Sequence, residues 1–308
     1  MSDLINKETG FILLGLLGVF CFSLTPIATR AAVENLNPIF VGIGRGVIAA
    51  LFAAVILLSF KQRWPDRNHY RDIFVVAGSV VILFPMLLSI GMQYVPAAHT
   101  GVMLGILPLL TAVVSVIRSG EKVAFTFWLL SILGAGTVVI FSYNQDDMKW
   151  SMADAILILA IVIGAIGYSE GAKLGRQIGS WQVICWALVF SFPLLLFPFL
   201  YVVLTDEFNA PIYSWYGFAY LTIISQLFGF FPWYYALSHG GTVRISQLML
   251  FMPFMTIMFS AYILGEAIGW EEWVFSIIIV FVVGLSFYIP KKSRSADIPS
   301  SIEVCKEQ

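Results

Sequence analysis

The chain has 308 residues, of which 59% are apolar and only 11% are charged, and its mean hydropathy is +0.90. Soluble domains contain roughly 25% charged residues, so this composition indicates a protein of the lipid bilayer and excludes an ordinary soluble domain. The formal net charge of −1 gives no reason to expect a nucleic-acid partner.

Ten apolar stretches follow one another along the chain, each long enough to cross a hydrocarbon core of about 30 Å as a helix. Their approximate ranges are 11–30, 38–60, 73–94, 97–117, 123–142, 152–172, 181–204, 213–237, 241–264 and 271–289. The stretches are continuously apolar, whereas the strands of a membrane β-barrel alternate in polarity over about ten residues. We therefore predict an all-α membrane protein with ten transmembrane helices, and we expect no cofactor.

Lys and Arg residues are distributed unevenly between the loops, and such residues accumulate on the cytoplasmic side of membrane proteins. If both termini are cytoplasmic, only Arg30 and Lys149 lie outside, Arg45 falls within a span, and 14 of the 17 Lys and Arg residues lie inside. The inner residues are Lys7, Lys61, Arg63, Arg67, Arg71, Arg118, Lys122, Lys173, Arg176, Arg244, Lys291, Lys292, Arg294 and Lys306. We therefore predict a multi-pass protein of the cell membrane with both termini in the cytoplasm.

The sequence repeats itself at a nearly constant spacing. Pro108, Thr111, Ser115, Gly120, Glu121, Trp128 and Ser131 recur 145 positions later as Pro253, Thr256, Ser260, Gly265, Glu266, Trp273 and Ser276, and Gly18, Ser23 and Arg30 recur 146 positions later. Because five spans end on the opposite side of the bilayer, the second copy is predicted to be inverted. We expect five-helix repeats in residues 1–145 and 146–290 and a polar cytoplasmic tail in 291–308. Inverted repeats are typical of alternating-access carriers, which bind substrate near the midplane.

Charged side chains in the hydrocarbon region cost about 2.5–3.5 kcal/mol each on insertion scales, so two of them require an explanation. Arg45 lies seven residues after Pro38, or about 10 Å along the helix at ~1.5 Å per residue. It either extends outward to pair with Glu34 or faces an aqueous cavity and holds a carboxylate. Glu170 either pairs with Lys173 on the same helical face or is a protonatable group on the substrate route.

His99 and Arg244 occupy the same position in the two copies, 145 residues apart. Inversion places His99 toward the outer face and Arg244 toward the inner face. We predict gating or coupling groups at the two mouths of one path, with Arg45 and Glu170 as further candidates. Histidine titrates near neutral pH, so protons are the candidate coupling ion. The alternative is that both residues anchor helix ends at the interface.

Polar, aromatic and sulfur-containing residues within the spans are the candidate lining of a substrate cavity, because small-molecule sites combine apolar walls with a few polar groups. The candidates are Ser23, Gln93, His99, Met103, Tyr168, Ser169, Gln226, Trp233, Tyr234 and Gln247, with Phe22 and Met249 beside them. Phe22-Ser23 recurs in the second copy as Tyr168-Ser169, which raises this pair above the others. For each residue taken alone, helix packing is the alternative explanation.

Asn37-Pro38 followed by Gly44-Arg45-Gly46 and an Ala-rich run resembles the second span of the EamA branch of the drug/metabolite transporter superfamily. Pro108 with Gly120-Glu121, and Pro253 with Gly265-Glu266, resembles that family's pattern at the ends of spans four and nine. The likeness extends from about Gly10 to Ile289.

The resemblance implies ten helices in two inverted halves, carrier activity, and a central cavity lined mainly by spans 1, 3, 4, 6, 8 and 9. Members of the family typically export amino acids, other metabolites or toxic compounds from bacteria. We expect Pro108, Glu121, Pro253 and Glu266 to have structural roles at helix ends.

Enzymatic signatures such as an HExxH helix, a GxSxG elbow or a Walker-type phosphate loop are missing from the sequence. We predict a secondary transporter, monomeric or homodimeric, that exports a small organic metabolite, with an amino acid as the leading candidate. The alternatives are a facilitated uptake carrier of another metabolite class and a membrane-embedded enzyme or scaffold that does not translocate.

Overall fold

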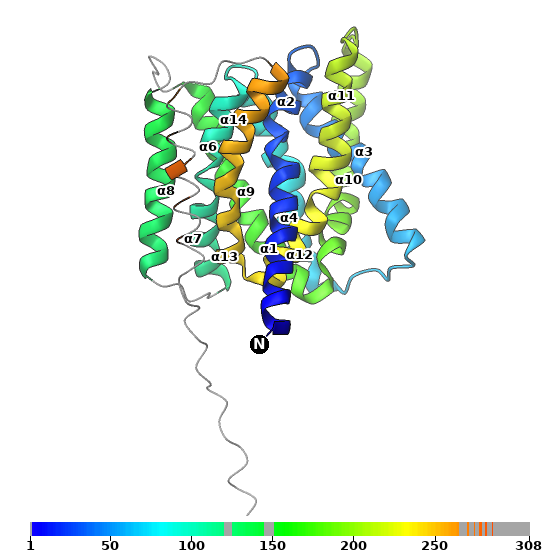
Figure 1. Ribbon diagram of the computed structural model, residues 1–308. Coiled ribbons are helices and arrows are strands. Elements are labelled where there is room, and N and C mark those ends of the chain that lie inside the picture. The colour runs from blue at the N-terminus through cyan, green and yellow to red at the C-terminus, as the bar shows by residue number, and fades with distance from the viewer. Residues whose placement is uncertain are drawn as a thin grey trace, which may run out of the picture.

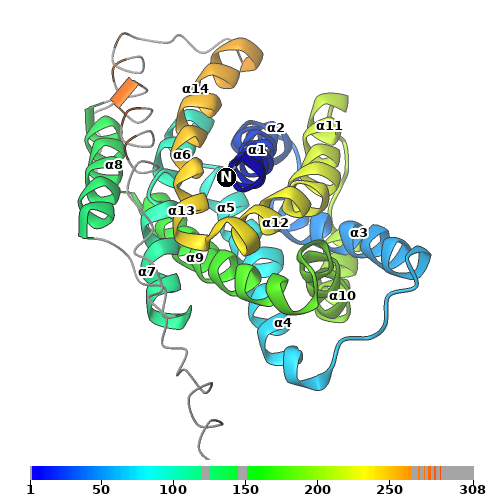
Figure 2. The same ribbon diagram turned by 60° about the horizontal axis from the view of Figure 1, so that its bottom comes forward.

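The computed structural model describes residues 2–119, 125–144 and 151–264, together with single positions beyond residue 264. Every regular element in these residues is a helix, and the helices pack side by side as a bundle (Figure 1, Figure 2). Six helical segments are long and apolar enough to cross a membrane, namely Glu8–Val33, Pro38–Ser59, Arg67–Gly91, Met152–Ile178, Ser180–Thr205 and Thr242–Ile263, and Leu107–Arg118 is a shorter apolar helix. The chain is therefore a multi-pass membrane protein.

The helices follow the first nine predicted ranges, several of which are divided into shorter elements. In chain order they are α1 (Ser2–Ser23), α2 (Thr25–Val33), α3 (Pro38–Ser59), η1 (Arg67–His69), α4 (Tyr70–Val76), η2 (Ala77–Leu83), α5 (Phe84–Gly91), α6 (Ala97–Leu104), α7 (Leu107–Ser119), α8 (Phe125–Asn144), α9 (Met152–Ile178), α10 (Ser180–Thr205), α11 (Ile212–Tyr220), η3 (Leu221–Phe228), α12 (Phe230–Gly240), α13 (Thr242–Ser246), η4 (Gln247–Leu250) and α14 (Phe251–Leu264). Most of the range 271–289, together with Glu121 and Glu266, lies outside the described residues.

Two helix starts are fixed by local capping. Asn37 caps α3, since its side chain accepts a hydrogen bond from the Ile39 N–H at 2.8 Å, and Pro38 occupies the first turn, where its missing N–H has no intrahelical partner to lose. Ser151 and Asp154 form a capping box at the start of α9, with the Ser151 N–H donating to Asp154 Oδ2 at 2.8 Å. From these starts α3 and α9 run as continuous helices.

The neighbouring helical segments that cross the bundle are interrupted near their middle. Pro26 lacks an N–H, and α1 gives way to α2 at Leu24. η2 and η3 are π-helical. Gly105-Ile106 separates α6 from α7, and the 3₁₀ segment η4 precedes α14. Pro108 and Pro253 lie within the first three residues of α7 and α14, directly after these last two breaks, so both prolines begin a new helix.

Matched positions of the two halves contact each other in the bundle. Phe22 and Tyr168, 146 residues apart, stack with ring centroids separated by 6.3 Å. Gln226 Nε2 donates a hydrogen bond to the Val80 carbonyl oxygen at 3.1 Å, again across 146 residues. α6 packs against α14 while α7 packs against α13, so these two paths run in opposite directions (Figure 1).

Candidate functional site

A small cavity of about 20 Å³ lies within the bundle, where the helix interruptions meet. Its lining comes from the six spans that the family resemblance implied and, in addition, from α3. The apolar lining residues are Phe22, Val80, Phe84, Leu88, Leu104, Leu107, Phe230 and Met252, and the polar ones are Thr25, Arg45, Tyr168 and Ser225. Within the described part of the chain, no acidic residue belongs to this lining.

Arg45 is the charged residue of the cavity lining. It is 2% exposed, and its Nε and Nη1 atoms have no hydrogen-bond partner among the described residues. Glu34 instead accepts a hydrogen bond from the Tyr213 hydroxyl at 3.2 Å. The predicted alternative in which Arg45 pairs with Glu34 is therefore wrong, because Arg45 lies two turns inside α3 and lines the cavity.

Hydroxyl groups and aromatic rings complete the wall around Arg45. Thr25 Oγ1 and Ser225 Oγ are 2.9 Å apart and join α2 to η3 by a buried hydrogen bond. The rings of Phe22 and Phe230 meet edge to face with centroids 5.0 Å apart, and Tyr168 lies 6.0 Å from Phe230 in the same manner. A guanidinium, hydroxyl donors and rigid aromatic walls can together bind a small molecule that has an anionic group and an apolar body.

The position of the cavity follows from the helix interruptions. Phe22 and Thr25 flank the break at Leu24, and Leu104 and Leu107 flank the break between α6 and α7. Irregular backbone at membrane depth is tolerated where it is buried in protein or lines a cavity, and carriers place such breaks at their substrate sites. Arg45 and Tyr168, by contrast, lie on the continuous helices α3 and α9, which hold their depth in the bundle.

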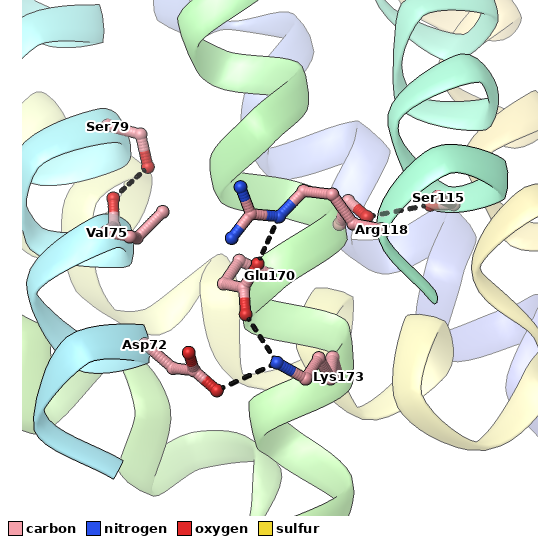
Figure 3. A network of polar contacts seen from close by, with 8 residues as sticks. Asp72, Val75, Ser79, Ser115, Arg118, Glu170 and Lys173 are labelled. Atoms are coloured by element: carbon pink, nitrogen blue, oxygen red, sulfur yellow. Dashed lines mark hydrogen bonds and ion pairs between the residues drawn. The ribbon is translucent and has the colours of Figure 1, made fainter. Parts of the chain in front are cut away.

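Glu170 forms the centre of a charged network (Figure 3). Its carboxylate accepts from Arg118 Nε at 2.6 Å and from Lys173 Nζ at 2.9 Å, and Lys173 Nζ also reaches Asp72 Oδ2 at 2.9 Å. The predicted pairing of Glu170 with Lys173 is confirmed. The carboxylate is 1% exposed, whereas the side chains of Arg118 and Lys173 are 37% and 36% exposed. The network joins α4, α7 and α9.

His99 and Arg244 lie near the starts of α6 and α13, which begin at opposite ends of the bundle (Figure 1). His99 Nε2 is 2.9 Å from Asp154 Oδ1, so this pair joins α6 to α9. Arg244 Nη1 is 3.3 Å from Glu8 Oε2 and joins α13 to α1. Neither His99 nor Arg244 belongs to the lining of the cavity, and each contacts an acidic residue outside that lining.

Three further predicted lining residues take part in buried contacts between helices or within one helix. Ser169 Oγ accepts a hydrogen bond from Ser115 Oγ at 3.0 Å, and Tyr234 Oη donates to the Gly167 carbonyl oxygen at 3.2 Å. Ser23 Oγ donates to the Phe20 carbonyl oxygen at 2.8 Å. These three residues thus lie on helices that line the cavity but do not belong to the lining itself.

The remaining predicted lining residues are also placed elsewhere. Met103, Trp233, Gln226 and Gln247 are buried, and among the described residues the Gln247 side-chain amide has no hydrogen-bond partner. Gln93 is exposed in the turn after α5, where its carbonyl oxygen accepts from Arg30 Nη1 at 3.1 Å. Of the ten residues predicted as lining, Tyr168 is the one that lines this cavity.

Several residues of the site were not anticipated from the sequence. Thr25 and Ser225 are ordinary hydroxyl residues in apolar spans and give no signal by themselves. Asp72 lies in the first turn of α4, after a segment that contains Lys61, Arg63 and Arg67. Its sequence context shows no pattern that points to Lys173. Asp154 could have been found, because its spacing of three residues from Ser151 is that of a capping box at a helix start.

Comparison with known proteins gives a consistent result over nearly the whole chain. A model described as the EamA-like transporter family matches residues 9–143 and again residues 151–288. The chain is 38% identical to the uncharacterized transporter YdeK of Bacillus subtilis over 90% of this chain and 97% of that protein. It is 20% identical to a probable terminal-alkyne amino-acid exporter of Streptantibioticus cattleyicolor over 78% of this chain and 80% of that protein.

A solved crystal structure has the same fold. It superimposes with a TM-score of 0.71 at 15% sequence identity and covers 91% of this chain and 99% of its own. The helical bundle, the two matches to one family model and the similarity to YdeK agree with one another. The chain belongs to the EamA-like transporter family of the drug/metabolite transporter superfamily.

Proposed function

We propose that the protein is a secondary transporter that exports small organic metabolites with a carboxylate group, amino acids among them, by alternating access. The observation that supports this best is the cavity between two ion pairs, both of which join α9 to the segment formed by α6 and α7. Arg118 and Glu170 join α7 to α9 on one side, and His99 and Asp154 join α6 to α9 on the other. A path to either side of the membrane opens when the pair on that side separates.

The arrangement of the two halves supports the same mechanism. Contacts between positions 146 residues apart and the antiparallel packing of α6 and α7 against α14 and α13 are those expected of inverted repeats over 1–145 and 146–290. We place the protein in the cell membrane with both termini in the cytoplasm, as the Lys and Arg distribution predicts. Export is favoured over uptake because the Streptantibioticus relative is named as a probable exporter.

Proton coupling at His99 is part of this proposal. The contact between His99 and Asp154 is an ion pair only when the imidazole carries a proton, so binding or release of that proton would alter the contact between α6 and α9. Glu170 is less suited to this role, because both oxygens of its carboxylate are already engaged, one by Arg118 and the other by Lys173. If His99→Gln and Glu170→Gln both leave the rate of transport in proteoliposomes and its pH dependence unchanged, coupling at these residues is refuted.

A comparison of spent media tests the export. Cells that overproduce the protein should release at least one metabolite several-fold faster than cells without it, and cells that overproduce Arg45→Ala should not. Arg71→Ala is the matched control, because Arg71 is an exposed residue of α4. Equal metabolite concentrations in the spent media of the two strains would contradict export. A metabolite that accumulates inside the overproducing cells would indicate uptake instead.

A further inference from the structure

The cavity has an uncompensated positive charge. Among the described residues, Arg45 is the only ionisable group of this lining apart from the phenol of Tyr168, and a guanidinium is charged at neutral pH. Glu170, the nearest acidic residue to Tyr168 along α9, is already paired with Arg118 and Lys173. Because a buried charge is costly unless it is paired and hydrogen-bonded, a ligand with one negative charge would neutralise this site.

We propose that Arg45, with the Thr25 and Ser225 hydroxyls, binds the carboxylate of small monoanionic organic acids with an apolar body, in preference to zwitterionic amino acids of the same size. This inference rests on the proposed function and names the substrate class of its cavity. A guanidinium is a planar group of N–H donors that forms strong, charge-assisted hydrogen bonds with carboxylate oxygens. Its Nε and Nη1 atoms have no protein partner in the described residues.

The hydroxyl pair supplies a further donor. Thr25 Oγ1 and Ser225 Oγ together have two protons, and their mutual hydrogen bond of 2.9 Å uses one of them. The second proton is therefore available to a ligand oxygen in the cavity that both residues line. A carboxylate held here would accept from N–H groups of Arg45 and from one hydroxyl of the pair, all of which belong to buried residues.

The rest of the ligand would meet apolar side chains. The rings of Phe22, Phe230 and Tyr168 line the cavity and would contact a hydrocarbon group once the helices part to admit a ligand. An α-ammonium group would restore the net positive charge and would find no carboxylate among the described lining residues. Burying that unpaired ammonium costs free energy, so removal of the ammonium from an amino acid should strengthen binding.

A matched ligand series tests this charge requirement on the unmodified protein. Binding to the full chain in lipid nanodiscs is measured by calorimetry for 3-phenylpropanoate, phenylalanine and 3-phenylpropan-1-ol, and in a second size for 4-methylpentanoate and leucine. Charge-assisted hydrogen bonds typically contribute about 1.5–3 kcal/mol, so the plain carboxylate should bind at least about tenfold more tightly than the alcohol or the amino acid. Equal affinities, tighter binding of the amino acids, or no saturable binding of either carboxylate would overturn the proposal.

Substitution of Arg45 gives a second test of the proposed carboxylate site. Arg45→Gln should weaken binding of 3-phenylpropanoate at least about tenfold and leave the alcohol within about twofold, and Arg71→Gln should change neither. If Arg45→Gln does not fold, Arg45→Lys keeps the charge and loses the planar group of N–H donors, and a smaller loss confined to the carboxylates is expected. An Arg45 variant that still discriminates carboxylate from alcohol as the unmodified protein does would refute the assignment.

The two proposals fail in different ways. Binding of carboxylates by the unmodified protein without release of any metabolite from cells would refute export and leave the carboxylate site in place. Release that is unchanged in cells with Arg45→Gln would refute the carboxylate site and leave export in place.

Discussion

Arg45 and Glu170 are almost equally buried, at 2% and 1% exposed, yet their surroundings are opposite. Glu170 lies between two cations at 2.6 and 2.9 Å, and its network ties three helices together. Arg45 has no acidic partner in the described residues and lines a cavity. Burial of a charge therefore does not reveal its role, whereas the presence or absence of a partner separates a structural contact from a ligand-binding group.

The difference does not follow from depth along the helices, because Arg45 lies seven residues after the start of α3 and Glu170 eight residues before the end of α9. It follows from the neighbouring side chains, since those of Arg118 and Lys173 reach the Glu170 carboxylate and still expose about a third of their surface, at 37% and 36%. Such cations bury their stems and keep contact with water. Arg45 lies two turns inside α3 among mainly apolar side chains, and the part of the cavity lining that the structure describes contains no acidic residue.

The largest expected effect comes from removing the unpaired charge. Arg45→Leu should abolish counterflow of 3-phenylpropanoate in proteoliposomes, while thermal stability in detergent stays the same or rises. The reason is that replacing a buried ionic group by an apolar one is often neutral or stabilising by about 1–4 kcal/mol. A marked fall in the melting temperature would show that Arg45 has a structural partner after all, and the comparison with Glu170 would no longer hold.

The opposite result is expected for Glu170→Gln. Two cations lose their counter-charge, and breaking a buried pair costs about 3–5 kcal/mol. Both cations can turn toward water, so we expect a loss of about 2 kcal/mol in the free energy of unfolding, read as a lower melting temperature of the purified protein. Glu207→Gln, in the exposed turn after α10, is the control and should change nothing. Equal stability of the two variants would show that the network is not structural.

Packing beside the network gives a third, smaller test. A methyl group added at Gly171 would overlap the ring of Tyr234, which is 0% exposed and hydrogen-bonded to Gly167. Overpacking of this kind costs about 1–3 kcal/mol, so Gly171→Ala should lower the melting temperature. Gly10→Ala is the matched control, because its added methyl group meets nothing within 4 Å. An unchanged melting temperature for Gly171→Ala would mean that α9 and α12 separate easily.

The smallest effect is expected at the edge of the network. Asp72→Asn removes one of the two carboxylates near Lys173, whose side chain is 36% exposed. Such exposed pairs contribute about 0–1 kcal/mol, so the melting temperature should fall by no more than about 1–2 °C. Combining Asp72→Asn with Glu170→Gln measures the coupling between the two carboxylates. A loss as large as that of Glu170→Gln alone would place the centre of the network at Lys173.

Hydropathy and helical spacing were sufficient for much of the fold. They predicted α3 and α10 to within one residue of their observed ends, and the three-residue spacing predicted the pair of Glu170 and Lys173. Both depend on the position of a residue along its own helix. The 145-residue offset likewise placed His99 and Arg244 at the starts of helices at opposite ends of the bundle.

The lining of the cavity was harder to predict, because it depends on how each helix is rotated against its neighbours. Ser23 and Thr25 are two residues apart, yet Thr25 lines the cavity and Ser23 does not. The break at Leu24 decides between them, and its geometry is not encoded by polarity. Gln93 illustrates a different error, since a predicted span that ended a few residues too late turned an exposed turn residue into a candidate ligand.

The unbroken course of α9 has a mechanical consequence. Asp154 and Glu170 lie 16 positions apart on this single helix, or about 24 Å at ~1.5 Å per residue. One rod therefore spans from the contact with His99 to the contact with Arg118. When a stiff rod pivots near its middle, its ends swing in opposite directions, so a tilt of α9 that pulls one pair apart presses the other together. In the proposed alternating-access mechanism, a lever of this kind would keep the two ion pairs from separating at the same time, through the rigidity of α9 alone.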